Sequence, residues 1–102
     1  MAKSKRQIKD VTPVEINGEK MFLKYNIFAI RKMEEMGIDL TQFGNNTKVS
    51  IEDICKILYC GLLTYDPSFT YDEVCMLIDI DDMEYLVDKV MEAMNSVNKS
   101  KN

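Results

Sequence analysis

The sequence predicts one small, mainly α domain of the α+β class, in which an N-terminal β-hairpin packs on about four helices. Three observations carry this prediction. An Asn17-Gly18 pair lies between two alternating apolar segments, a helix over residues 51–63 is apolar on nearly all sides, and capped amphipathic segments precede and follow that helix. The length of 102 residues fits a single domain.

Both ends of the chain are predicted to be disordered tails. Residues 1–10 show no apolar periodicity and carry a cluster of basic side chains, namely Lys3, Lys5, Arg6 and Lys9. Residues 98–102 are polar. We therefore expect a folded domain over residues 11–97 between two solvated ends. The basic tail could alternatively serve as an interaction arm.

A β-hairpin is predicted over Pro13 to Lys24. Asn-Gly is the preferred pair for a type I′ turn, which needs a positive φ at both central residues. With a two-residue loop, the register places four apolar side chains on one face: Val14, Ile16, Met21 and Leu23. Because an isolated hairpin is only marginally stable, this face must pack on the helices.

A first helix is predicted over about residues 27–36, with Asn26 as its N-cap. Gly37 follows as the glycine after the helix end, and Ile38 is placed for the hydrophobic contact of a C-terminal capping motif. Residues 39–49 are predicted to form a loop, from which Leu40 and Phe43 reach the core.

The central helix is predicted over Ile51–Leu63, with Ser50 as N-cap and Asp53 at the third helical position. A helix that is apolar nearly all round is a buried one. Its two apolar faces consist of Ile51, Ile54, Cys55, Leu58 and Leu62, and of Ile57, Tyr59, Cys60 and Leu63. It stops before Pro67, because a residue that precedes proline avoids the α region.

Two more helices are predicted after this stop. Thr70 and Glu73 form a capping box for a short helix ending near Ile78, and Asp81 caps a final helix over about residues 82–97. The apolar stripe of the final helix consists of Met83, Leu86, Val87, Val90, Met91, Met94 and Val97.

The residue types argue against an enzyme. Histidine, the commonest general base, is absent, and the glycines are isolated rather than grouped in a phosphate-binding loop. The cysteines, Cys55, Cys60 and Cys75, are interpreted as small buried apolar residues. The acidic run at Asp79–Asp82 has Met83 where a calcium loop needs an oxygen ligand, so helix capping explains it better. We expect no catalysis, no cofactor and no metal.

Charge and hydropathy narrow the class of partner. The formal net charge is −4, and residues 66–92 hold nine acidic side chains against one basic residue, Lys89. An acidic folded part does not favour nucleic acid, whose phosphates need a basic face, and it suits a basic partner. No apolar run approaches the ~20 residues of a membrane span. The N-terminus lacks the apolar region of a signal peptide, so we expect a cytosolic protein.

Binding to another protein is the remaining class. Tyr59, Tyr65, Phe69 and Tyr71 cluster at the end of the central helix and in the loop after it. Partly exposed aromatic side chains often anchor interfaces, which makes these four the candidate protein-binding residues. The alternative is that they attach the loop to its own core. The internal methionines suit either an adaptable interface or gaps in the core.

Two segments resemble the tail assembly chaperones of long-tailed bacteriophages. One is L-x-Y-x-x-x-A-I-x-x-M-E-E-M-G-I-D-L, from Leu23 to Leu40. The other, between Ser50 and Asp79, is a helix ending in GLL, a DP loop, T-x-x-E-V and a short helix ending in LID. The resemblance that rests on these two segments extends over roughly residues 14–97.

The resemblance implies a non-enzymatic phage or prophage protein, of the short form made without a frameshift. Such a protein would bind the tape measure protein in the host cytoplasm, help recruit tail tube protein and be absent from the mature virion. The protein could also associate with further copies of itself. Two other classes also remain: a structural virion component such as a head–tail connector, and a small helical regulatory protein that contacts DNA through its basic arm.

Overall fold

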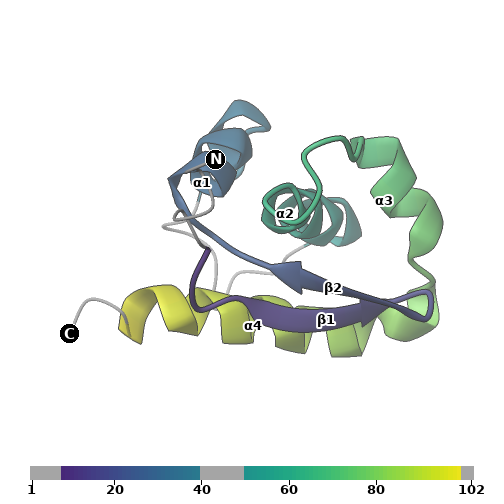
Figure 1. Ribbon diagram of the computed structural model, residues 1–102. Helices are drawn as coiled ribbons and strands as arrows, with labels where there is room; N and C mark the ends of the chain where they lie inside the picture. The colour runs from purple at the N-terminus through teal and green to yellow at the C-terminus, as the bar shows by residue number, and fades with distance from the viewer. Residues whose placement is uncertain (1–7, 40–49, 100–102) are drawn as a thin grey trace.

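The computed structural model describes residues 8–39 and 50–99, with residues 96–99 described by their backbone alone. In these ranges it has the predicted α+β architecture, a two-stranded antiparallel hairpin followed by four helices (Figure 1). The elements are β1 (Thr12–Ile16), β2 (Glu19–Leu23), α1 (Ile27–Glu35), α2 (Ile51–Leu62), α3 (Tyr71–Leu77), a 3-10 helix η3 (Ile80–Asp82) and α4 (Met83–Lys99).

The hairpin has the predicted turn and register. Asn17 and Gly18 have φ angles of 56° and 80°, as a type I′ turn requires. Val14 pairs with Met21, and the four apolar side chains predicted to share a face are all buried. Thr12 is buried at the end of the same face.

The hairpin lies between α2 and α4, and α2 is the centre of the fold. In Figure 1, α2 is seen nearly end-on, with α1 on one side and α3 on the other, while α4 runs along the hairpin. The contacts agree: α2 packs on α1, α3, α4 and β2, and α4 packs on both strands. Ser50 Oγ accepts the N–H of Asp53 at 3.1 Å, which confirms the predicted N-cap of α2.

Helix α1 ends in the predicted capping motif. Gly37 has a φ of 84°, and its N–H donates to the carbonyl of Glu34 at 3.1 Å. The Ile38 N–H donates to the carbonyl of Met33 at 2.9 Å, which completes a Schellman motif. Asn26 is the N-cap, as predicted.

The start of α4 differs from the prediction. Asp79, not Asp81, begins the turn, because residues 80–82 form a 3-10 helix before α4 starts at Met83. The N–H of Asp79 donates to the carboxylate of Asp82 at 3.3 Å, so the acidic run makes local backbone contacts. The capping box of α3, between Thr70 and Glu73, is present as predicted.

The buried stripe of α4 is also narrower than predicted. Leu86, Val90 and Ala93 lie on its inner line at steps of four and three residues, and all three are buried. Met91 follows Val90 by about 100° around the helix, so it lies at the edge and is 38% exposed. The side chain of Val97 lies outside the described residues.

The two chain ends depart from the predicted boundaries. The Lys24 ammonium donates to the carbonyls of Lys9 and Asp10, so the last residues of the predicted N-terminal tail are attached to the hairpin. Helix α4 continues to Lys99, because no proline or glycine interrupts it. No helix in the described ranges is both long and apolar enough to cross a membrane. Leu40 and Phe43 lie outside these ranges.

Candidate functional site

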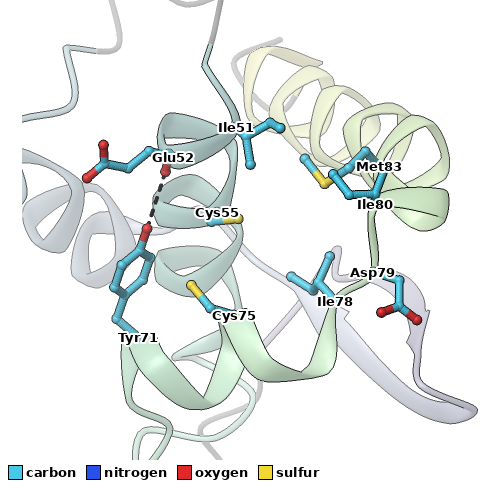
Figure 2. A pocket seen from close by; sticks show the side chains of 9 residues that line it. All are labelled: Ile51, Glu52, Cys55, Tyr71, Cys75, Ile78, Asp79, Ile80 and Met83. Atoms are coloured by element: carbon cyan, nitrogen blue, oxygen red, sulfur yellow. Dashed lines mark hydrogen bonds between the residues drawn. The ribbon is translucent and has the colours of Figure 1, made fainter.

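A pocket of about 350 Å³ opens between α2, α3 and the start of α4 (Figure 2). We name it the α2–α3 groove. Its lining consists of Ile51, Glu52 and Cys55 from α2, Tyr71 and Cys75 from α3, and Ile78, Asp79, Ile80 and Met83 from the segment that leads into α4.

Two isoleucine side chains that line the groove are exposed to solvent. Ile51 is 56% exposed and Ile80 is 70% exposed. The prediction that Ile51 is buried was wrong: it is the first residue of α2, and its side chain lines the open groove instead of the core. Ile80 lies in the 3-10 helix between two aspartates, where a short turn offers no apolar face to cover it. Exposed apolar side chains beside a hollow are typical of interaction sites.

The rim of the groove is acidic and its hydrogen-bonding groups are few. Glu52 and Asp79 supply carboxylates, and Lys56 pairs with Glu52 at 3.5 Å on the outer surface of α2. The Tyr71 hydroxyl donates to the backbone carbonyl of Glu52 at 3.5 Å, which ties α3 to α2 (Figure 2). Burial, together with Cys75, raises the pKa of Tyr71 to about 12.

The cysteines occupy two different environments. Cys60 is fully buried on the α1 side, with its Sγ 3.7 Å from Met36 Sδ, and burial raises its pKa to about 11. Cys55 is buried in the groove, where burial and the neighbouring Cys75 thiol raise its pKa. Cys75 is half-buried, so the prediction of a buried residue holds for the other two only. Within residues 8–39 and 50–99, no group of three or more potential ligands is arranged to hold a metal ion.

The four aromatic candidates form two separate pairs rather than one cluster. Tyr59 and Tyr71 meet edge-on with ring centroids 5.8 Å apart. The ring centroids of Tyr65 and Phe69 are 6.4 Å apart. Phe22 of β2, which the sequence did not suggest, packs edge-on against Tyr65 at 5.2 Å. All four candidates are half-buried, and Tyr71 is the one that lines the groove. The other three pack against the core.

Sequence reasoning therefore missed most of the groove. Ile80 gave a usable signal, since it is a lone isoleucine within an acidic run between two helices. Met83 and Ile51 gave none, because each fits the apolar pattern of its own helix and reads as a core residue.

Comparisons of the chain with protein-family models, with curated proteins and with solved structures each gave no match. An apolar groove with exposed isoleucines, an acidic rim and few inward hydrogen-bonding groups suits apolar side chains from another protein better than a polar ligand.

Proposed function

We propose that this protein is a non-enzymatic assembly chaperone of a long-tailed bacteriophage or prophage. It binds the tape measure protein and helps recruit tail tube subunits during tail morphogenesis. The observation that carries the binding role is the α2–α3 groove, with Ile51 and Ile80 exposed at its mouth. The resemblance of the two sequence segments to tail assembly chaperones supplies the identity of the partner.

The groove would take one apolar ridge of an amphipathic helix. Helices docked in grooves present anchors at positions i, i+3 or i+4 and i+7. One or two such side chains would fill the pocket, while Ile51 and Ile80 cover the rest of the ridge. Burial of apolar surface stabilises the complex by roughly 25 cal/mol per Å² before the cost of ordering the partner is subtracted.

The acidic surface selects the kind of helix that docks. Glu52 and Asp79 lie at the groove, and Asp81 is exposed beside it. Lysine or arginine next to the apolar ridge of the partner would face these carboxylates and increase the association rate. A tape measure segment with this pattern would be covered while it is unassembled, and so kept from aggregating.

Contacts between the two resembling segments support the assignment. The Tyr25 hydroxyl in the first segment donates to the Ile57 carbonyl in the second at 2.9 Å. The Tyr25 ring lies against Gly61, the glycine of the GLL motif. The motif residues thus belong to one packing unit, as residues shared through a common fold would.

Tyr71 extends the proposed surface beyond the groove. It lines the pocket and meets Tyr59, so a partner helix longer than the pocket would next reach this aromatic pair. Tyr65 and Phe69 lie in the loop between α2 and α3 and form the outer part of the proposed surface. The protein would act in the host cytoplasm and be left out of the mature virion.

The test is co-expression of the full chain with the tape measure protein of the same genome. We expect the chain to raise the soluble fraction of the tape measure protein and to co-purify with it. Ile51→Gln and Ile80→Gln should each weaken binding about tenfold, the loss expected for an interface anchor. Ile27→Gln is the matched control for Ile51→Gln, since Ile27 is the exposed first residue of α1. Met76→Gln is the control for Ile80→Gln, since Met76 is 84% exposed and lies outside the groove.

Three results would contradict the proposal. Equal losses in the groove variants and their controls would exclude the groove as the binding site. Recovery of the protein in purified phage particles would favour a structural virion component. Binding to duplex DNA with a steep salt dependence would favour a DNA-contacting regulator.

A further inference from the structure

Two thiols share the wall of the α2–α3 groove. Cys55 comes from α2 and Cys75 from α3, and both line the pocket (Figure 2). The two helices are packed against each other. Burial and, next, the nearby Cys75 thiol raise the pKa of Cys55. Cys60, on the opposite side of α2, is sealed against Met36.

The pair differs from a single buried cysteine in two ways: a reagent in solution can reach one of its thiols, and the second thiol lies on the neighbouring helix. Cys75 is half-buried at a solvent-open pocket, so a small reagent can reach it. A disulfide needs two cysteines on neighbouring backbone segments with side chains that meet, which a pair on packed helices can satisfy. Neither thiol stabilises the fold through a covalent bond, since all three cysteines are free.

We propose that Cys55 and Cys75 form a redox-sensitive modification site that a low-molecular-weight disulfide closes into an intramolecular disulfide. The thiolate of Cys75 attacks one sulfur of the reagent, which breaks the reagent's S–S bond and releases its first thiol. Cys55, as its thiolate, then attacks the sulfur of Cys75 and displaces the second thiol. Two protein thiols are oxidised to one disulfide, one reagent disulfide is reduced to two thiols, and the protons of Cys55 and Cys75 pass to the released thiolates.

Closure would change the groove itself. A bond between the two sulfurs joins α3 to α2 and replaces two free thiols in the lining with one fixed disulfide. If the groove holds the tape measure protein, as proposed above, the oxidised form should bind it more weakly. This consequence rests on the proposed function, whereas the closure does not.

The experiment treats the full chain with glutathione disulfide and then quenches it with acid. Thiol titration after denaturation should show that two of the three thiols are lost. Peptide mapping without reductant should identify a Cys55–Cys75 link in a monomeric chain. Cys60→Ala is the control and should close like the wild type. Cys55→Ser should stop at a glutathione adduct on Cys75, and Cys75→Ser should form no disulfide because the buried Cys55 does not meet the reagent directly. Circular dichroism checks that each variant is folded, and the mapping of the wild type decides the matter even where a variant does not fold.

Several results would overturn the proposal: persistent glutathione adducts on the wild type, a link that includes Cys60, disulfide-joined dimers, or no reaction. A second assay compares the reduced and the oxidised wild type for binding to the tape measure protein, with an expected loss of about tenfold that reductant restores. A closed disulfide with unchanged binding would support the modification site and exclude the groove as the tape measure site. The two proposals therefore fail separately.

Discussion

The ring of Tyr25 lies directly against the backbone of Gly61. A Cβ atom at position 61 would be 2.5 Å from Tyr25 Cζ and 2.6 Å from its hydroxyl oxygen, closer than real Cβ contacts. The hydroxyl reaches past this glycine to the carbonyl of Ile57 at 2.9 Å, and the Lys24 N–H donates to the carbonyl of Gly61 at 3.0 Å. The two residues that follow β2 are thereby joined to the second half of the central helix.

Gly61→Ala should destabilise the protein, although alanine is the better helix former. The gain in helix propensity is about 0.5–1 kcal/mol. Overpacking a filled core costs about 1–3 kcal/mol, and the Tyr25 ring, which is only 2% exposed, would have to shift within the core to admit the methyl group. Urea unfolding measures the difference. In a Tyr25→Ala background the same change should become neutral or stabilising, and a loss of equal size in both backgrounds would contradict this contact.

Because of Tyr25, the free energy of unfolding should depend on pH in the alkaline range. Complete burial raises the pKa of its hydroxyl well above the ordinary value of about 10. Its contribution is therefore fully present below about pH 10 and is lost as the pH rises toward the folded-state pKa, because the unfolded chain ionises first.

Tyr25→Phe tests this sign. The variant should be less stable than the wild type by about 0.5–1.5 kcal/mol near neutral pH, through loss of the hydrogen bond to Ile57. The gap should shrink as denaturation is measured at rising pH above about 10. Cys60 and Tyr71 titrate in both proteins, so they largely cancel in the comparison. A constant gap would contradict the buried hydroxyl.

Leu58→Ala should be a severe core mutation. Leu58 is 0% exposed on α2, and removal of a buried leucine side chain to alanine costs about 2–5 kcal/mol. Chemical denaturation gives the value, and Met76→Ala on the exposed side of α3 is the control, with a change within about 0.5 kcal/mol. A loss below about 0.5 kcal/mol for Leu58→Ala would mean that α2 is not the centre of the core.

Substitutions of Tyr65 and Phe69, in the loop between α2 and α3, should affect stability and partner binding differently. Tyr65 packs on both Phe22 and Phe69, so Tyr65→Ala should lower the melting temperature more than Phe69→Ala does. Binding to a tape measure fragment is measured beside it. A variant that stays folded and loses the partner supports the outer part of the proposed surface. Wild-type binding by both folded variants would direct attention to the methionines of α4, of which Met91 is exposed.

Chelation should leave the protein unchanged. The described residues contain no cluster suited to a metal ion, and the carboxylate of Asp82 accepts the backbone N–H of Asp79. We expect the same melting temperature with and without EDTA. A fall of several degrees that zinc or calcium reverses would show that the interpretation of the cysteines and aspartates is wrong.

Local interactions account for what the sequence could predict. The I′ turn at Asn17-Gly18, the caps at Ser50 and Thr70 and the Schellman motif at Gly37 each join residues only a few positions apart. Their geometry depends on residue type and spacing, so the hairpin register, the end of α1 and the starts of α2 and α3 follow from the sequence. The 3-10 helix before α4 was missed because three aspartates in four residues offer several equivalent caps.

The tertiary structure alone decided which apolar residues stay uncovered. The pattern of α2 assigns Ile51 and Leu58 to the same face, yet Leu58 is buried and Ile51 lines an open groove. Helical periodicity gives a direction around one axis, but burial depends on whether another element lies in that direction. The contact between Tyr25 and Ile57 spans 32 residues, and the groove joins α2 to the start of α4. Such sites arise when separate elements pack, and no local pattern in the sequence records where packing leaves a gap.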